Sequence, residues 1–391
     1  GGATKTITGT SETRILLMLT ACVGVQALVL ASTGPLVQNW FSRARPGRSP
    51  YRLYALSNLG SLLALVSYPF VVEPNLPRVD QARLWSIGFA AFVVFSAVSA
   101  FLVWRAGMTA ARAAPDPVHA RSSTNVPQVT SRILWFLLPA CACVLLLATT
   151  NQICVNVAVV PFLWILPLGL YLLSFILAFS GAGWYPRVAY GVLLPVGVAG
   201  VWALLEYAPS IVVQVAGYSA VLFICCMVCH GELVRLKPDP ADLTSFYLMI
   251  AAGGAAGGAF VVLLAPFLFP GYFELHVGLV TCCLLVLAAY AQDDRSALRG
   301  LRPRWVWALL GLLLACLSGG LVYEAREFMA DALSISRNFY GVLSVAEEGS
   351  TARTHRYVLS HGSTIHGLQF DDPVKRRWPT TYYGEGSGVG L

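Results

Sequence analysis

Charged side chains are scarce in this chain. Asp, Glu, Lys and Arg make up 12% of its 391 residues, whereas ordinary globular proteins carry roughly a quarter. Hydrophobic residues make up 57%, and the mean hydropathy is +0.68. One soluble core cannot bury that much apolar surface, so the composition argues against a freely soluble enzyme and indicates a lipid bilayer as the surrounding solvent.

A basic stripe with interleaved aromatic residues is also missing. Such a stripe is typical of nucleic-acid-binding surfaces. The net charge is +7, but the Lys and Arg residues lie between apolar runs. We interpret them as signals of membrane topology and expect no nucleic-acid partner.

No disulfide framework and no metal site can be recognised. The ten cysteines lie inside or at the edge of apolar runs, where Cys behaves as a small hydrophobic residue, and they leave the redox compartment open. Cys226, Cys229 and His230 match the C-x-x-C-H pattern of c-type haem attachment, but their place at the end of an apolar run favours an ordinary helix end. His361 and His366 lack a third ligand, so we expect no metal.

What the chain does contain is a series of apolar runs of bilayer-spanning length. About 20 consecutive apolar residues cross the hydrocarbon core as a helix. The ten predicted spans cover residues 14–33, 51–72, 84–104, 133–150, 158–180, 188–206, 211–229, 244–269, 273–291 and 305–322. The sequence therefore predicts an all-α polytopic membrane bundle of about ten transmembrane helices.

The longest polar interruption divides the predicted bundle in two. Residues 106–131 contain three prolines and are predicted to form a linker. We expect a first transmembrane bundle of three helices in residues 1–105 and a second of about seven helices in residues 132–323. Residues 324–391 are expected to form a small β-rich segment outside the membrane.

Two spans share a weak internal similarity. Residues 54–61 and 247–254 each begin with Tyr and open a Gly- or Ser-containing span that runs on to a proline, Pro69 or Pro266. Many transporter folds are built from internal repeats. The similarity therefore favours a transporter-like bundle.

Basic residues are distributed unevenly between the predicted loops. One set of loops holds Arg43, Arg45, Arg48, Arg52, Arg105, Arg112, Arg121, Arg132, Arg187, Arg235, Lys237, Arg295, Arg299, Arg302 and Arg304. The opposite short loops hold only Arg78 and Arg83. By the positive-inside rule the first set is cytoplasmic. With ten spans both termini then face outward, so we expect the C-terminal segment to be extracytoplasmic.

Ionisable residues gather at one predicted membrane boundary. His230, Glu232, Arg235 and Lys237 follow directly on an apolar run. Such groups near lipid are candidates for function, because burying them unpaired is costly. A structural alternative is that Glu232 pairs with Arg235 or Lys237 in a tight loop, and the sequence leaves both alternatives open.

Other polar residues lie in or at the ends of the predicted spans. They are Gln26, Asn58, Asn151, Gln152, Asn156 and Glu206. Polar side chains at these depths hold helices together or line a cavity. We take Asn58 and Glu206 as candidates for an intramembrane polar site.

A run of small residues, AAGGAAGG, occupies positions 251–258. Glycines four residues apart allow a neighbouring helix to approach backbone to backbone. A phosphate-cradling loop is the alternative, but the preceding strand and the Lys of that motif are missing. We therefore predict helix packing.

The character of the chain changes after the last span. Residues 338–345, 354–359 and 363–365 are short β-prone runs separated by turns. This pattern predicts a small antiparallel sheet at the C-terminus.

Several stretches carry a family resemblance. They are residues 51–65 (YRLYALSNLGSLLAL) with Tyr68-Pro69 and Glu73-Pro74, residues 160–168 (VPFLWILPL), residues 229–233 (CHGEL) with Lys237-Pro238, and residues 361–383. In these stretches the chain resembles bacterial membrane proteins that fuse a transporter-like (MFS-like) bundle to a spermidine synthase domain. The resemblance covers nearly the whole chain and implies a place in the bacterial cytoplasmic (inner) membrane.

The resemblance also implies substrate-binding residues. The segment with His361, His366 and Gln369 is similar to a turn of aminopropyltransferases whose glutamine lies near the nucleoside of decarboxylated S-adenosylmethionine. Tyr382 or Tyr383 is similar to a tyrosine at the polyamine site. In that family a Gly-rich strand-to-helix turn and an acidic residue come next, and the resemblance implies that both would follow Leu391.

Three functional hypotheses follow. The first is a membrane-integral, spermidine synthase-like protein that is catalytically incomplete as given. It would bind no cofactor itself, and decarboxylated S-adenosylmethionine only if a Rossmann domain follows. The second is a transporter for amines or another small solute, and the third is a non-catalytic subunit or assembly factor that binds other membrane subunits. Whether the protein is an enzyme stays open.

Overall fold

The computed structural model describes most of the chain. The described residues are 13–44, 51–113, 129–157, 160, 162–238, 242–292, 304–338, 340–351, 353–384 and 386–387. Residues 114–128 of the predicted linker and the basic residues Arg45, Arg48, Arg121, Arg295, Arg299 and Arg302 lie outside these ranges. The chain forms two compact units, residues 1–132 with 237–248 and residues 133–236 with 249–391, which are described separately below.

The protein is mostly helical, and eight of its described helices are long and apolar enough to cross a membrane. They are Thr13–Ser42, Tyr51–Asn75, Arg78–Arg105, Val129–Val157, Arg187–Tyr207, Ile211–Arg235, Leu243–Leu268 and Glu274–Ala291. The other two predicted spans fall on a shorter apolar helix, Ile165–Ser180, and on the helix Arg304–Ala330. Large apolar side chains such as Leu28, Val212 and Phe267 are more than 70% exposed. These helices give the chain the composition of a multi-pass membrane protein.

The first unit contains three long helices. Its elements are η1 (Thr20–Gly24), α2 (Val25–Ala44), α3 (Tyr51–Ser67), η2 (Tyr68–Val72), α4 (Glu73–Asn75) and α5 (Arg78–Ala113). The α5 helix continues beyond residue 105 into the segment predicted as a linker. Tyr51 is buried, donates a hydrogen bond to the carbonyl of Pro238 (2.6 Å) and packs edge-on against Phe246. This tyrosine therefore joins α3 to the segment 237–248.

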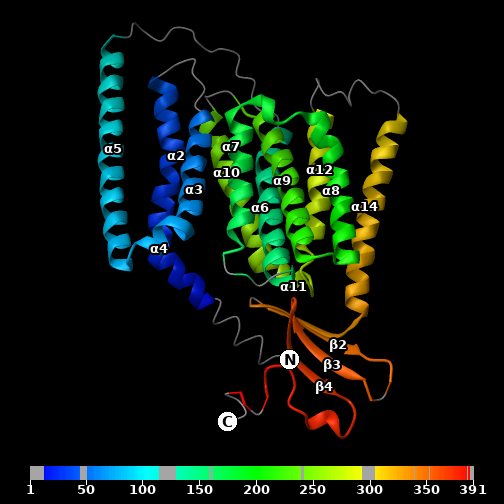
Figure 1. Cartoon of the computed structure of the whole chain (residues 1–391). Coiled ribbons are helices and arrows are strands. Elements are labelled where there is room, and N and C mark those ends of the chain that lie inside the picture. Colours follow the sequence, from blue (N-terminus) through cyan, green and yellow to red (C-terminus); the bar gives the residue numbers. More distant parts are fainter. Residues whose placement is uncertain are drawn as a thin grey trace. The chain divides into compact units, whose positions relative to one another are not determined.

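The second unit is a helical bundle followed by a sheet (Figure 1). Its helical elements are most of α6 (Val129–Asn151), η3 (Gln152–Val157), α7 (Ile165–Ser180), η4 (Ala182–Trp184), α8 (Arg187–Tyr207), α9 (Ile211–Arg235), most of α10 (Leu243–Ala259), η6 (Phe260–Leu264), α11 (Ala265–Leu268), α12 (Glu274–Gln292) and α14 (Arg304–Ala330). Helix α9 packs against α7 and α8. Its residues 225–233 are all buried, so the core of this unit lies around the second half of α9.

The small-residue run lies inside α10 and packs as the sequence predicts. A Cβ atom on Gly253 would overlap the carbonyl oxygen of Phe136, and one on Gly257 would overlap that of Ala140. The two helices α6 and α10 therefore meet backbone to backbone, which confirms the helix-packing prediction. The alternative, a phosphate-cradling loop, is wrong because residues 251–258 are helical.

Two spans widen into π-helix beside a proline. Segment η6 ends two residues before Pro266, and η2 contains Pro69. A proline cannot donate its helical hydrogen bond and its ring crowds the carbonyl four residues earlier, and a wider turn relieves that crowding. These are the two spans that share the weak sequence similarity. The local geometry is alike in both, while a repeat origin stays a prediction.

A four-stranded antiparallel sheet follows the bundle, as the sequence predicts in outline. Its strands are β1 (Ala332–Asn338), β2 (Gly341–Glu348), β3 (Arg356–His361) and β4 (Thr364–Phe370), paired in chain order. The three predicted runs correspond to β2, β3 and β4, and β1 was not predicted. Helix α14 continues to Ala330, because residues 324–330 are mostly good helix formers that carry the helix past the apolar run.

Candidate functional site

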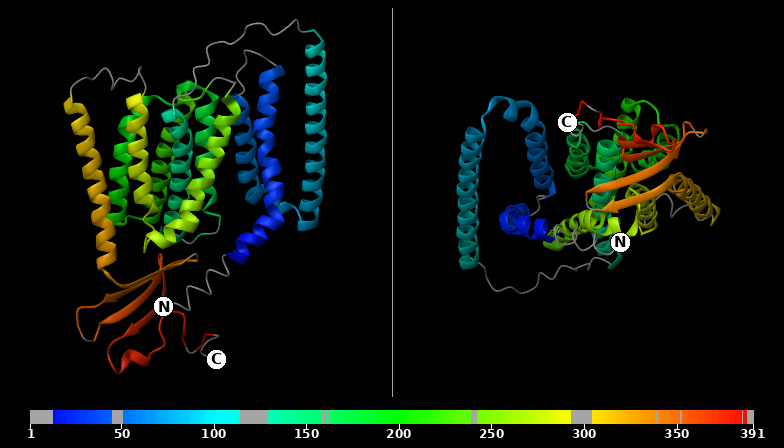
Figure 2. Two further views of the ribbon diagram at one scale, coloured as in Figure 1. Left: turned by 180° about the vertical axis from the view of Figure 1, so that it is seen from behind. Right: turned by 90° about the horizontal axis from the view of Figure 1, so that it is seen from below.

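Helix ends of the second unit meet the sheet on one side of the bundle (Figures 1 and 2). The last residues of α6 with η3, the end of α8, the start of α12 and the end of α14 all come to this side. Arg187, Arg235 and Arg304 lie at the other ends of α8, α9 and α14. The unit therefore has arginines at helix ends on one side and the sheet on the opposite side.

The β3–β4 hairpin is tied to the bundle through backbone contacts. Ser363 donates from its backbone N–H (3.2 Å) and from its hydroxyl (3.3 Å) to the carbonyl of Val155 in η3. Gly362 has a φ of +57°, and a Cβ atom there would overlap the same carbonyl oxygen. Only glycine combines this backbone conformation with such a close approach.

A buried ion pair ties the other edge of the sheet to the bundle. Arg337 of β1 contacts the carboxylate of Glu274 and the carbonyl of Gly271, and both side chains of the pair are at most 4% exposed. The Arg337 guanidinium also lies 5.0 Å from the centre of the Tyr272 ring. Burial raises the pKa of Tyr272, partly offset by the Arg337 charge, so this phenol is neutral at physiological pH.

A cavity of about 250 Å³ lies between the helix ends and the sheet. We call it the polar chamber. It is lined by Gln152, Asn156, Leu205, Tyr272, Phe273, His276, Glu324, Phe328, Val342, Ser344 and Gly362. The lining combines amide, hydroxyl, imidazole and carboxylate groups with three aromatic rings.

The ionisable centre of the polar chamber is a His–Glu pair. Nε2 of His276 on α12 lies 2.5 Å from Oε2 of Glu324 on α14, and both side chains are less than 20% exposed. The other ring nitrogen of His276, Nδ1, is buried and has no hydrogen-bond partner among the described residues. If Nε2 carries the proton toward the carboxylate, Nδ1 presents a lone pair, and the Glu324 carboxylate is the charged acceptor of the chamber.

Amide groups form a second wall of the polar chamber. Asn156 donates from Nδ2 to Oε1 of Gln152 (2.8 Å), and Gln152 donates from Nε2 to the hydroxyl of Tyr218 (3.2 Å). Gln152 and Asn156 lie one turn apart in η3. The sequence marked both as residues that either hold helices together or line a cavity, and they do both.

The chamber lining is suited to a small amine. A carboxylate and amide oxygens accept hydrogen bonds from an ammonium group, and aromatic faces attract cations. Among the described lining residues, no Lys or Arg is present. His276 and Glu324 were missed at the sequence level, where they lie close to other ionisable residues, Glu274 and Arg326, at the edges of apolar runs.

The residues implied by the family resemblance cluster elsewhere on the sheet. The rings of His361 and His366 stack with centres 5.8 Å apart, and Nδ1 of His366 lies 2.5 Å from the hydroxyl of Tyr382. Tyr383 packs on Tyr382 with ring centres 4.6 Å apart, and their hydrogen bond raises the pKa of Tyr382. Four of the five implied residues thus form one group outside the chamber lining, in which the two histidines are half-buried and the two tyrosines exposed.

Gln369, the fifth implied residue, is exposed and lies farther along β4, opposite Tyr357. Between the two places β4 has a bulge: Gly367 pairs with Leu359 and Ile365 with Ser360, which leaves His366 as the extra residue. A bulge re-aims a side chain. Here His366 comes to the same side as His361.

Glu232, one of the ionisable residues at the predicted membrane boundary, lies inside helix α9 and not in a tight loop. Glu232 is fully buried, and Arg187 donates to both of its oxygens, from Nε to Oε1 (2.7 Å) and from Nη2 to Oε2 (2.5 Å). Glu232 is thus paired with Arg187 of α8, a partner that the sequence analysis did not consider. A pairing between residues 45 apart in sequence is visible only once α8 and α9 pack together.

The surroundings of this pair are also buried. His230 accepts or donates a hydrogen bond at Nδ1 with the hydroxyl of Ser174 (2.9 Å) and stacks on Phe175, with ring centres 3.6 Å apart. Burial and the charge of Glu232 raise the pKa of Tyr185 beside it. Arg235 lies at the end of α9, and Lys237 belongs to the first unit, with Nζ 5.2 Å from the centre of the Tyr51 ring.

The two intramembrane candidates lie in different units. Asn58 lies in the first unit and donates from Nδ2 to the carbonyl of Tyr54 (2.9 Å) within its own helix. Glu206 is exposed near the end of α8 in the second unit. Its neighbour Leu205, not Glu206, lines the polar chamber.

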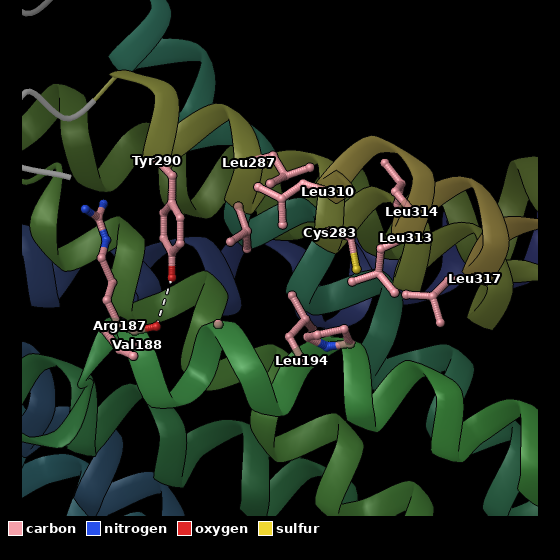
Figure 3. A pocket seen from close by; sticks show the side chains of 13 residues that line it. Arg187, Val188, Leu194, Cys283, Leu287, Tyr290, Leu310, Leu313, Leu314 and Leu317 are labelled. Atoms are coloured by element: carbon pink, nitrogen blue, oxygen red, sulfur yellow. Dashed lines mark hydrogen bonds between the residues drawn. The ribbon is translucent and has the colours of Figure 1, made fainter. Parts of the chain in front are cut away.

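A second cavity, of about 340 Å³, lies among α8, α12 and α14 (Figure 3). Its described lining is apolar except for Arg187, Tyr290 and the thiol of Cys283. Tyr290 donates a hydrogen bond to the backbone carbonyl of Arg187 (3.1 Å), and the Arg187 guanidinium lies 4.5 Å from the centre of the Tyr290 ring. Leucines fill the rest, so this cavity suits hydrocarbon and not an amine.

Comparison with known proteins finds no similar protein. No protein-family model matches the chain. No curated protein and no solved structure matches it either.

Proposed function

We propose that this is a multi-pass membrane protein that binds a small aliphatic amine in the polar chamber. The observation that carries the proposal is the Glu324 carboxylate, whose side chain is 19% exposed and which lies with amide oxygens and aromatic rings in one cavity. These are the groups that recognise ammonium ions. The resemblance to spermidine synthase fusion proteins, whose substrates are polyamines, points to the same ligand class.

The amine-binding test replaces Glu324 by Gln in the detergent-solubilised full chain. Gln still accepts a hydrogen bond from His276 but carries no charge, so the variant separates charge from packing. A charged hydrogen bond contributes about 1.5–3 kcal/mol, so the affinity for spermidine or putrescine is expected to fall about 10- to 100-fold. Isothermal titration calorimetry measures the affinity.

Two controls accompany this measurement. Glu327→Gln removes an exposed carboxylate one turn along the same helix and is expected to leave binding unchanged. The uncharged diol 1,4-butanediol is expected not to bind. Equal binding by the wild type and Glu324→Gln, or an equal loss with Glu327→Gln, would overturn the assignment.

We also infer that the sheet end of the second unit faces outward from the bacterial inner membrane, with a transporter-like bundle of about ten spans. Support comes from the arginines Arg187, Arg235 and Arg304, which lie at helix ends of the second unit opposite the sheet. By the positive-inside rule that end is cytoplasmic. The chamber would then take its ligand from the outer side.

Thiol labelling in intact cells checks this orientation. Ser350 is exposed in the turn between β2 and β3, and Thr130 is exposed at the start of α6. A membrane-impermeant maleimide is expected to label Ser350→Cys above the background of the wild type, and to label Thr130→Cys only after the membrane is permeabilised. The reverse pattern would place the sheet in the cytoplasm.

A carrier function is the second candidate. It is favoured by the ionisable residues buried within the apolar helix α9, a feature of membrane transport pathways. Uptake of labelled putrescine into proteoliposomes above that of empty liposomes, lost in Glu324→Gln, is the expected result for a carrier. The third hypothesis, a subunit that binds other membrane proteins, stays a prediction.

A further inference from the structure

Three cysteine thiols converge in the interior of the helical bundle. Cys141 of α6, Cys229 of α9 and Cys282 of α12 have their Sγ atoms all within 4.8 Å of one another. All three side chains are buried, with at most 4% exposed. The sequence does not reveal this group, because its members lie on three helices far apart in the chain.

The spacing of the thiols fits a metal site. The Sγ atoms of Cys229 and Cys282 are 3.8 Å apart. A soft metal ion binds thiolate sulfur at about 2.3 Å, and three or four sulfurs at that distance in trigonal or tetrahedral geometry are about 3.8–4.0 Å apart. Cys225, one turn before Cys229 on α9, also has its thiol within hydrogen-bond reach of Cys282.

Packing of cysteines as small apolar residues is the simpler explanation. It accounts for the exposed thiols of Cys22 and Cys316 on the surface of apolar helices. Such packing does not explain why sulfur atoms from three helices converge on one point. Of the six buried cysteines, four lie together, because the thiol of Cys282 contacts those of Cys141, Cys225 and Cys229.

We propose that Cys141, Cys229 and Cys282 form a binding site for a soft monovalent cation, Cu(I). Thiol and thiolate ligands select Cu(I) over harder ions. The low dielectric of the bundle interior penalises net charge. Each thiol that binds as thiolate releases its proton to solvent, and a single thiolate is enough to neutralise the charge of Cu(I). This inference does not depend on the polar chamber.

Chelator competition tests the site. Purified full-length protein in detergent is titrated against the Cu(I)–bicinchoninate complex, with ascorbate to keep copper reduced. The wild type is expected to withdraw one Cu(I) per chain, and Cys282→Ser to lose at least about tenfold in affinity, the scale of effects at metal sites. Cys316→Ser, which removes an exposed thiol, is the matched control and is expected to bind as the wild type does.

A second variant and a spectroscopic measurement complete the test. Cys229→Ser is expected to lose affinity as Cys282→Ser does, while both elute as the wild type does in size-exclusion chromatography. X-ray absorption of the copper-loaded wild type is expected to show sulfur as the only neighbour of copper. A wild type that withdraws no Cu(I), or a loss in Cys316→Ser equal to that in Cys282→Ser, would overturn the proposal.

Discussion

Replacing Glu232 by Gln is expected to lower the free energy of unfolding by about 3–5 kcal/mol, the usual cost of breaking a buried ion pair from one side. Glu232 is fully buried and takes two hydrogen bonds from Arg187. The Gln amide is uncharged, so it leaves the guanidinium of Arg187 without a counter-charge. The Arg187 side chain is only 15% exposed. Denaturant unfolding in mixed micelles, followed by tryptophan fluorescence, measures the change.

The exposed ion pair of Arg356 and Glu348 in the sheet is the matched control. Their side chains are 40% and 45% exposed, so Glu348→Gln is expected to cost at most about 1 kcal/mol. The double variant Arg187→Gln with Glu232→Gln removes both charges and is expected to be more stable than Glu232→Gln alone. A single Glu232→Gln variant as stable as Glu348→Gln would show that the buried pair contributes little.

Substituting Gly257 by Ala is expected to destabilise the second unit by about 1–3 kcal/mol, the range for overpacked interiors. The added methyl group would overlap the carbonyl oxygen of Ala140, so α6 and α10 must move apart. The direction of the change in stability is informative, because a Gly to Ala substitution inside a helix otherwise stabilises the protein by up to about 1 kcal/mol. The melting temperature of the purified protein reports the direction.

Gly254 provides the control within the same run of small residues. A Cβ atom there would meet no other atom within 4 Å, so Gly254→Ala is expected to be neutral or slightly stabilising. Shifts of the same sign and size in Gly254→Ala and Gly257→Ala would mean that close approach to α6 does not determine stability at this interface.

The helices could be predicted from length and apolarity, because lipid leaves little alternative to a helix for such runs. Strand β1 could not be predicted. Its residues follow a helix that continues for eight residues past the last apolar span, and no turn signal separates the two. The run of small residues shows the opposite case, since a spacing of four directly encodes a contact between helices.

The candidate site was predicted only in part. Gln152 and Asn156 stand out as amides at the end of an apolar run, and they line the polar chamber. His276 and Glu324 are 48 residues apart and meet only when α12 packs on α14, as Arg187 and Glu232 meet across α8 and α9. An ionisable residue at the edge of an apolar run is the signal that could have found them, since such a residue close to lipid needs a partner.

The central claim, that the polar chamber binds an amine from the outer side of the membrane, is tested most directly at Ser344. This residue lines the chamber from β2. In spheroplasts that carry the Ser344→Cys variant, an impermeant maleimide is expected to label the new thiol, and spermidine is expected to slow that labelling where 1,4-butanediol does not. Labelling only after permeabilisation, or at a rate that spermidine leaves unchanged, would contradict the claim.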